Sequence, residues 1–528
     1  MKVAVVGSGV SGTLTSISPL LNEHSKHEVH LYEADSRPGG HANTVRFVPP
    51  EGSGHESVDV DTGFIVCNPS TYPNFLGFLR SNGDIKINAT EMTFAVSRDR
   101  GLFEWAGDNL FTIFCQPWRV LDPRMWELIY DVLRFNACSR ELITGTNKRD
   151  TAENEQLSIG EYLEREHYSD SFRDNYLIPM TAAVWSTPPD KCSLGFPART
   201  LIKFMHNHHL LQITGKPKWL TIQGGSRSYV RKIISALPDG HLHLSAPVLG
   251  ISSRANPDAV SGHTVSVKYK TQDGHEEIEE YDHVILACHS DTALSMLAAG
   301  DGGASPDEKR ILGRVRWNRN VVVLHSDISL MPRRRLAWSC WNYLTESATD
   351  ENGTSKANND QVALTYWMNE LQHLPEDKHG PVLVTLNPPF EPAPDRTFGR
   401  YQYDHPILDA EAVLSQNEMT TIQGKRGISY AGAWLKYGFH EDGFTSGLRA
   451  AADHIPAVQA PFGIKSPDRD PDMLWLPIFF HLFERSGAKT VVAVVAGFWL
   501  RLVRVVIGHV VDLTQLESEL RTAEKRRK

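Results

Sequence analysis

Three glycines near the N-terminus, Gly7, Gly9 and Gly12, follow an apolar run at residues 2–6, and Glu33 follows a second apolar run. Gly7 permits a tight strand-to-helix turn, Gly9 lets a pyrophosphate approach the backbone, and Gly12 lets the helix pack closely on its strand. The phosphates would lie at a helix N-terminus, whose free N–H groups favour negative charge. A carboxylate about twenty residues after the glycines accepts hydrogen bonds from ribose hydroxyls. The spacing therefore predicts a dinucleotide-binding site.

A second glycine pair lies soon after the ribose-binding carboxylate, within residues 34–41. Pro-Gly-Gly has a high turn propensity, and the pair is preceded by Arg37. With the first motif, this segment resembles the flavin-containing amine oxidase superfamily, which also holds phytoene desaturases, protoporphyrinogen oxidases and polyenoic fatty acid isomerases. The resemblance implies that Gly39 and Gly40 bring backbone against the pyrophosphate and flavin of FAD.

Four further segments resemble this superfamily in the expected order, at residues 59–64, 222–249, 281–289 and 428–447. The resemblance covers roughly residues 1–455, and we expect FAD to be bound non-covalently. A helix N-terminus in the last segment would stabilise negative charge on the reduced flavin. The cofactor-binding residues predicted from these motifs are Gly7, Gly9, Val10, Ser11, Gly12, Glu33, Ala34, Arg37, Gly39, Gly40, His41, Thr62, Gly63, Val248, Gly432, Trp434, His440, Glu441, Asp442 and Gly443.

His440 is the candidate catalytic acid–base residue, because it lies in the flavin-edge motif and an imidazole can titrate near neutral pH. A histidine that hydrogen-bonds the cofactor for structure is the alternative. Many amine oxidases carry a lysine, bridged by water to flavin N5, just before the strand that here is expected at 321–325. Residues 317–320 read Trp-Asn-Arg-Asn. The missing lysine disfavours oxygen-coupled amine oxidation and favours desaturation, dehydrogenation or isomerisation.

Aromatic residues are the candidates for a substrate pocket, because aromatic walls suit a large apolar or planar molecule. Packing in the protein core is the competing interpretation for each of them. The predicted substrate-binding residues are Trp341, Tyr343, Tyr366, Trp367 and Tyr437.

The chain also resembles a narrower group of amine-oxidase-like NAD/FAD-binding proteins, through residues 61–66, 185–189, 331–334 and 438–443. Bacterial members of that group tend to accompany lipid-modifying enzymes such as cyclopropane fatty acid synthases. We therefore expect an FAD-dependent oxidoreductase that oxidises or desaturates an apolar, lipid-like substrate by hydride transfer to flavin N5, with oxygen or another electron acceptor. A redox-neutral fatty acid isomerase is one alternative. A non-catalytic lipid- or prenyl-binding protein, similar to Rab GDP-dissociation inhibitors, is the other.

Composition narrows the class of partner. The net charge of -9 argues against a nucleic-acid-binding protein. The basic runs at 333–335 and 525–528 are expected to be solvated. The six cysteines form no CxxC pair, and the histidines at 206–209 lack an acidic partner at a ligand spacing, so no metal site is predicted.

Strand-like and helical runs alternate along the chain and predict an α/β fold. We expect a discontinuous Rossmann-like FAD-binding domain at 1–90, 212–300 and 420–456, and an inserted α+β substrate domain at 91–211 and 301–419. Helices are expected at 12–23 and 125–142, and strands at 265–270, 281–287, 321–325 and 382–387. Polar stretches at 145–156, 252–262, 299–307 and 349–361 are typical of surface loops.

The remaining residues, 457–528, form an apolar C-terminal tail. Two arginines, Arg501 and Arg504, interrupt its longest apolar run, so an interfacial hairpin, a membrane span and packing on the protein itself all stay open. Because the first strand is expected to begin at Lys2, we expect no cleaved signal peptide. We expect a membrane-associated protein facing the cytoplasm, with a cytoplasmic protein as the alternative.

Overall fold

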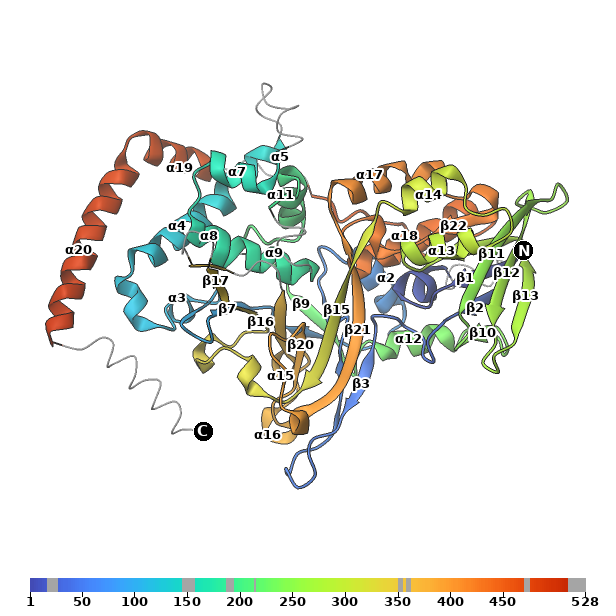
Figure 1. The fold of residues 1–528 in the computed structure, drawn as a ribbon, viewed down its shortest axis with the longest axis horizontal. Coiled ribbons are helices and arrows are strands. Elements are labelled where there is room, and N and C mark those ends of the chain that lie inside the picture. Colours follow the sequence, from blue (N-terminus) through green and yellow to red (C-terminus); the bar gives the residue numbers. More distant parts are fainter. Residues whose placement is uncertain are drawn as a thin grey trace.

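The computed structural model describes residues 1–16, 27–144, 157–186, 194–212, 215–349, 355–357, 362–469 and 475–510. Two sheet-containing halves lie side by side, and a helical extension follows at the C-terminus (Figure 1). Several sequence predictions fall outside the described residues: the end of the first helix at 17–23, residues 187–189, the stretch at 145–156, most of 349–361, and the basic tail at 525–528.

A five-stranded parallel sheet forms the core of the first half, as the α/β prediction requires. Its order is β10-β2-β1-β14-β22. The strands are β1 (Lys2–Val6), β2 (Glu28–Tyr32), β10 (Leu242–His243), β14 (His283–Leu286) and β22 (Ile428–Tyr430). Because both faces are covered, β1 (KVAVV) and β14 (HVIL) read as nearly continuous apolar runs in the sequence.

The two faces of this sheet pack against different layers. Val3 and Val5 face helices, whereas Ala4 and Val6 face a three-stranded antiparallel sheet. The helical layer contains the π-helix η1 (Ser11–Ser16), α2 (Pro73–Ser81), α12 (Arg227–Ile234) and α18 (His440–His454). The second sheet consists of β11 (Val248–Ala255), β12 (His263–Lys270) and β13 (Glu276–Tyr281), beside α13 (Ser290–Ala299), α14 (Pro306–Leu312) and α17 (Ala410–Glu418).

A seven-stranded mixed sheet forms the second half, in the order β21-β15-β20-β19-β16-β7-β8. Its strands are β7 (Phe94–Arg98), β8 (Phe103–Ala106), β15 (Arg316–His325), β16 (Trp341–Thr345), β19 (Ala363–Trp367), β20 (Leu383–Leu386) and β21 (Thr397–Ile407). One face packs on α4 (Pro123–Cys138), α7 (Ile159–Arg165), α8 (Asp170–Phe172), η3 (Arg173–Leu177), α9 (Ile178–Trp185) and α11 (Ala198–Asn207). β15 begins five residues before the predicted start at 321, because Asn318 and Asn320 are buried polar residues that interrupt the apolar pattern.

Shorter elements connect the two halves and line their edges. The small strands are β3 (Thr44–Phe47), β4 (Val58–Asp61), β5 (Val66–Cys67), β6 (Ile87–Thr90), β9 (Trp219–Ile222), β17 (Ser347–Thr349) and β18 (Ser355–Ala357). The short helices are α3 (Leu110–Ile113), η2 (Pro117–Leu121), α5 (Glu141–Thr144), η4 (Ile328–Leu330), η5 (Arg335–Ala337), α15 (Met368–Leu371), α16 (Glu376–His379), η6 (Pro394–Arg396), η7 (Met419–Thr421), η8 (Lys425–Gly427) and η9 (Ala433–Leu435).

The C-terminal extension contains α19 (Leu476–Arg485) and α20 (Ala488–Val510). Glu484 of α19 accepts hydrogen bonds from Tyr130 (2.9 Å) and pairs with Arg134 (2.8 Å), both on α4. α20 lies at the left edge of the molecule, away from both sheets (Figure 1). Residues 488–507 of α20 have a mean hydropathy of 2.0, and none of the scored residues is buried in the protein. By length and composition this helix could cross a membrane.

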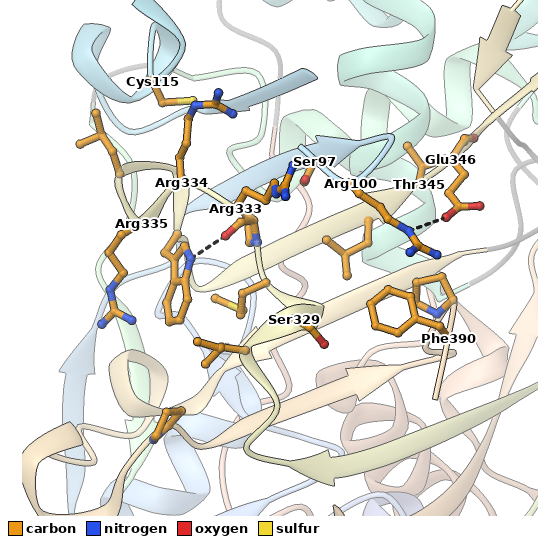
Figure 2. Close-up of a pocket in the computed structure, with 18 of the residues that line it drawn as sticks. Ser97, Arg100, Cys115, Ser329, Arg333, Arg334, Arg335, Thr345, Glu346 and Phe390 are labelled. Carbon is orange, nitrogen blue, oxygen red and sulfur yellow. Dashed lines mark hydrogen bonds and ion pairs between the residues drawn. The ribbon is translucent and has the colours of Figure 1, made fainter. Parts of the chain in front are cut away.

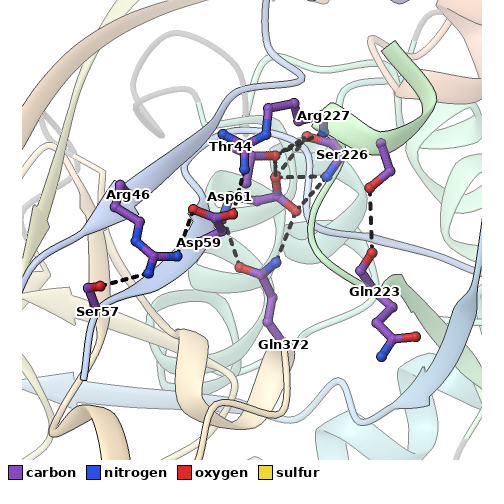
Figure 3. Close-up of polar contacts among 10 residues, drawn as sticks. Thr44, Arg46, Ser57, Asp59, Asp61, Gln223, Ser226, Arg227 and Gln372 are labelled. Atoms are coloured by element: carbon purple, nitrogen blue, oxygen red, sulfur yellow. Dashed lines mark hydrogen bonds and ion pairs between the residues drawn. The ribbon is translucent and has the colours of Figure 1, made fainter. Parts of the chain in front are cut away.

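The buried carboxylate of Asp61 joins three segments from both halves (Figure 3). It accepts hydrogen bonds from Thr44 Oγ1 (2.6 Å), Ser226 N (3.0 Å), Ser226 Oγ (2.7 Å) and Gln372 Nε2 (3.1 Å). A Cβ on Gly225 would lie 2.5 Å from Thr44, so only glycine fits the turn beside this carboxylate. Burial raises the pKa of Asp61 to about 6, and these hydrogen bonds oppose that rise. The contact fixes the β3–β4 hairpin against α12 and the loop that follows α15.

Asp61→Asn should destabilise the fold, because the new amide group would face donors that now reach a carboxylate. We expect the free energy of unfolding to fall by about 2–3 kcal/mol, measured by urea denaturation and circular dichroism. Asp59→Asn is the matched control, since Asp59 lies two residues away and forms partly exposed ion pairs with Arg46 and Arg227. Its cost should stay below about 1 kcal/mol. Equal losses in the two variants would contradict a special role for Asp61.

Candidate functional site

The glycine turn after β1 has the geometry of a nucleotide cradle. Gly7 has a φ of +100°, and a Cβ on it would lie 2.5 Å from Ala287 O. A Cβ on Gly12 would lie 1.9 Å from Gly7 O, whereas a Cβ on Gly9 would meet no protein atom within 4 Å. The first two glycines are therefore required by packing. Gly9 instead borders open space, which fits a close approach by a pyrophosphate.

The double-glycine segment packs directly on this turn. Gly39 N donates to Ser8 O (3.0 Å) and Ser8 Oγ (3.1 Å), and a Cβ on Gly40 would lie 3.1 Å from Gly9 Cα. Gly39 and Gly40 have φ values of +114° and +54°. Arg37 donates to Gly40 O (3.0 Å) and so closes the turn on itself. Two motifs thirty residues apart thus form one glycine-rich surface.

Glu33 lies directly after β2, at the edge of the sheet where the glycine turn begins. Its carboxylate accepts hydrogen bonds from Ser8 N (2.9 Å), Ser8 Oγ and Asp35 N (2.8 Å). The backbone of Ala246 donates to Glu33 O (2.8 Å), which brings the start of β11 at Val248 beside the same edge. Ala34 is exposed next to it. The predicted ribose and adenine contacts therefore share one end of the sheet.

The closing segment returns to the same cradle through α18. A Cβ on Gly443 would lie 2.6 Å from Val10 Cγ1 and 2.8 Å from Ser11 Oγ, so the first turn of α18 abuts the glycine turn. The α18 N-terminus and the start of η1 converge here, which suits an anionic group. Gly432 N, after β22, donates to Ser446 Oγ of α18 (3.0 Å).

Three residues of the closing segment are satisfied inside the protein. Glu441 accepts hydrogen bonds from Asn74 N and Phe75 N (both 2.9 Å) at the start of α2, and burial raises its pKa to about 7. Asp442 accepts from Tyr437 N (3.2 Å) and Phe439 N (3.0 Å), and burial raises its pKa to about 6. Trp434 is buried in the core, and its Nε1 donates to Cys288 O (3.2 Å). These side chains hold the cradle in shape.

A cavity of about 180 Å³ opens between the two halves, beside the closing segment. Seven of the residues predicted for the cofactor or substrate line it: His41, Thr62, Gly63, Trp341, Tyr366, Tyr437 and His440. Tyr343 is buried in the neighbouring core, and Trp367 packs against Trp338 with ring centroids 5.5 Å apart. Neither of these two lines the cavity. Successive residues of a strand face opposite sides, so Tyr366 reaches the cavity and Trp367 does not.

His440 stands at the first position of α18 and faces this cavity. Its Nε2 lies 2.7 Å from Tyr229 Oη, and its ring stacks on Phe64 with centroids 3.7 Å apart. Burial lowers the pKa of His440 to about 3. The imidazole is therefore neutral at pH 7, and this favours a hydrogen-bonding role over proton transfer by an imidazolium.

Sequence reasoning missed Tyr403 and His405, which also line the cavity from β21. Tyr403 Oη lies 2.7 Å from Thr62 Oγ1, and His405 Nδ1 lies 2.9 Å from Asn320 Nδ2. Tyr401, Tyr403 and His405 recur at every second position, which was the available signal for one face of a strand. Asn320 lies in β15, within residues 317–320, where the resemblance implies a lysine.

A second, larger cavity of about 950 Å³ lies elsewhere on the seven-stranded sheet (Figure 2). It contains no residue of the cofactor motifs, so size alone does not identify the site. Arg333, Arg334 and Arg335 line it. Arg334 is buried and pairs with the fully buried Glu104 (3.0 Å), so the prediction that 333–335 is solvated is wrong for this residue.

The sequence profile of the family described as "Flavin containing amine oxidoreductase" matches residues 19–325, more than half of the chain. The chain belongs to the flavin-containing amine oxidoreductase family. No curated protein sequence matches it significantly. This family assignment confirms the predicted fold, the enzyme class and FAD as the cofactor.

Solved structures share the fold of this flavin-containing amine oxidoreductase. A CLA-producing fatty acid isomerase from P. acnes aligns over 86% of this chain and 98% of its own, with 13% identity and a TM-score of 0.54. Cyclohexylamine oxidase from Brevibacterium oxydans IH-35A aligns over 86% of this chain and 98% of its own, with 14% identity and a TM-score of 0.53. Reduced UDP-galactopyranose mutase aligns over 86% of this chain and 93% of its own, with 16% identity and a TM-score of 0.53. At these identities the likeness establishes the fold alone.

Gly9→Ala should fold like the wild type but bind FAD about tenfold more weakly or worse, because the added methyl group meets only the space meant for the cofactor. Gly12→Ala is the contrasting variant, since its methyl group would clash with Gly7 O. The measurements are the flavin-to-protein absorbance ratio and the melting temperature of the apoprotein. Normal FAD content in Gly9→Ala would refute the cradle.

Lowering the pH should destabilise the protein in part through His440. Its folded pKa is depressed, so the unfolded chain binds the proton more tightly and stability falls as pH drops below about 6.5. His440→Gln should reduce this slope between pH 6 and 5 by up to about 1.4 kcal/mol per pH unit, measured by urea denaturation. An unaltered slope in His440→Gln would mean that His440 titrates normally.

Proposed function

We propose that this enzyme oxidises or desaturates an apolar, lipid-like substrate in the cavity beside α18. One observation carries the proposal: none of the described residues that line the cavity is Asp, Glu, Lys or Arg. A charged substrate group would lose its hydration there without gaining an ionic partner, at a cost of several kcal/mol. An apolar segment would enter at a gain of roughly 25 cal/mol per Å² buried.

The histidines of the cavity do not restore charge at neutral pH. Burial lowers the pKa of His208 and His405 to about 4 and of His440 to about 3, and it lowers the pKa of His41 well below its ordinary value. All four imidazoles are therefore neutral at pH 7. A protonated amine would find no carboxylate among the described residues that line the cavity. This disfavours amine oxidation, as does the absence of a lysine at 317–320.

Trp341 lines the cavity and is its candidate polar contact to a substrate. Its Nε1 is buried and has no hydrogen-bond partner among the described residues. A buried donor without a partner costs about 1–3 kcal/mol, so an acceptor oxygen on the bound substrate would relieve that cost. The volume of about 180 Å³ suits the reacting segment of a chain with one such oxygen.

Bound FAD supplies a hydride acceptor for this chemistry. The contribution of the protein is to orient the substrate between aromatic walls and to exclude water. The Tyr229–His440 pair keeps a neutral hydrogen-bonding group at the cavity wall, as a candidate contact to substrate or cofactor. The exposed apolar face of α20 supports association with a membrane surface, where a lipid substrate would be found.

A redox-neutral isomerase is the second candidate. The structural likeness to a CLA-producing fatty acid isomerase favours it, because that fold also accommodates a reaction on a fatty acid without net oxidation. Both candidates share the uncharged cavity, and they differ in the final state of the flavin.

Anaerobic mixing of the detergent-solubilised holoenzyme with unsaturated or cyclopropane fatty acids distinguishes the candidates. Lasting bleaching of the flavin spectrum would support net oxidation, and a rearranged product with an unbleached flavin would support isomerisation. Bleaching by a primary amine and by no lipid would overturn the proposed substrate class.

Trp341→Phe should raise KM about fivefold or more and leave kcat less affected, because it deletes one hydrogen bond of about 1 kcal/mol.

A further inference from the structure

A cluster of imidazoles and one carboxylate lies at the edge of the parallel sheet, apart from the flavin site. β10 pairs with β2 in parallel, with Leu242 opposite Leu31 and His243 opposite Tyr32. This register places His241 beside His30, and the two rings stack with centroids 4.3 Å apart. Glu28 lies two residues before His30 on β2 and so shares its face.

The donor atoms of Glu28, His30 and His241 converge. Glu28 Oε1 lies 3.0 Å from His30 Nε2, and no two of the three donor atoms are more than 4.8 Å apart. In a tetrahedral zinc site with bonds of about 2.0–2.1 Å, neighbouring donor atoms lie roughly 3.3 Å apart. Because the His30 and His241 rings are stacked 12° from parallel, both must also turn toward each other for their lone pairs to meet at one ion.

The remaining ring nitrogens are held in the way that metal-binding histidines require. His241 Nδ1 lies 2.9 Å from Val29 O, and a proton donated there leaves the lone pair on Nε2. His30 Nδ1 lies 3.1 Å from His243 Nε2, so a proton donated there leaves the lone pair on His30 Nε2. Histidines that ligate metals typically donate their other N–H to such a partner, which fixes the tautomer and ring orientation.

We propose that Glu28, His30 and His241 bind one Zn²⁺ ion, with water as the fourth ligand. Two imidazoles and one carboxylate are a donor set that zinc accepts. The imidazoles are neutral ligands, and the single negative charge of the carboxylate balances part of the charge of the Zn²⁺ ion. The side chain of Glu28 is 52% exposed, which gives the ion a path from solvent.

The location assigns the ion a structural role. β10 contains two residues and pairs with β2 alone, at the edge of the sheet. An ion shared by β2 and His241, the residue just before β10, would fasten this edge strand. After β10 the chain runs beside Glu33 and Asp35. Ala246 N donates a hydrogen bond to Glu33 O (2.8 Å), and Ser245 N donates one to Asp35 O (2.9 Å). Zinc would thus stabilise the strand pair that leads to the ribose-binding carboxylate.

The test uses full-length holoenzyme without an affinity tag, freed of metal by dialysis against a chelator. Isothermal titration with Zn²⁺ should show one more equivalent bound by wild type than by Glu28→Gln or His241→Ala, or an affinity at least tenfold higher at that site. Zinc at about 100-fold excess over Kd should raise the melting temperature of wild type by about 2 °C and not that of the variants.

Glu28→Gln keeps the shape of an exposed side chain, so its loss of binding does not depend on misfolding. His275→Ala, which removes an exposed histidine elsewhere, should bind zinc like the wild type. Mg²⁺ should bind at none of these residues, since it prefers oxygen ligands. Equal zinc stoichiometry and affinity in wild type and Glu28→Gln would overturn the proposal, as would equal stabilisation of both by zinc.

Discussion

The carboxylate of Asp61 is the constraint on which the rest of the site depends. Four donated hydrogen bonds from three segments converge on one buried side chain, and a buried carboxylate tolerates the loss of such partners poorly. The next two residues, Thr62 and Gly63, line the cavity, so their positions follow from the fixing of Asp61. Gln372 brings the second half of the molecule to the same point. The Asp61 contact, together with the Thr62–Tyr403 hydrogen bond (2.7 Å), joins the two halves of the molecule beside the cavity.

Burial controls the chemistry of the site in two opposite ways. Around the cradle, Glu441 and Asp442 are buried but accept backbone hydrogen bonds that orient α2 and the turn before α18. Within the cavity, burial removes charge from the histidines instead. The result is a polar frame around an uncharged interior. Such an interior strengthens each remaining dipole and hydrogen bond, because little water is present to screen them.

Local geometry could be predicted from the sequence, whereas contacts between distant residues could not. Gly12 and Gly39 are needed because a Cβ would lie 1.9 Å from Gly7 O and 2.7 Å from Ala42 O, both a few residues away, so their pattern was visible in the chain. The early start of β15 was hidden because its polar residues face partners that only the folded chain provides, such as His405 for Asn320. The cluster at Glu28, His30 and His241 was invisible for the same reason, since His241 lies far along the chain from the two residues of β2. The alternation of β19 separates Tyr366 from Trp367, and a list of aromatic residues could not make that distinction.

The order of strands in the parallel sheet also constrains how the protein is made. β1 pairs with β14, and β14 with β22, so residues near 5, 285 and 429 must meet before the sheet is complete. At about 5–20 residues per second, synthesis reaches β22 roughly 20–90 s after β1. During this interval the apolar first strands lack their final neighbours, and non-local pairing of this kind folds slowly. Nascent chains should therefore depend on chaperones, and the flavin cradle should close only when all but the C-terminal extension has emerged from the ribosome.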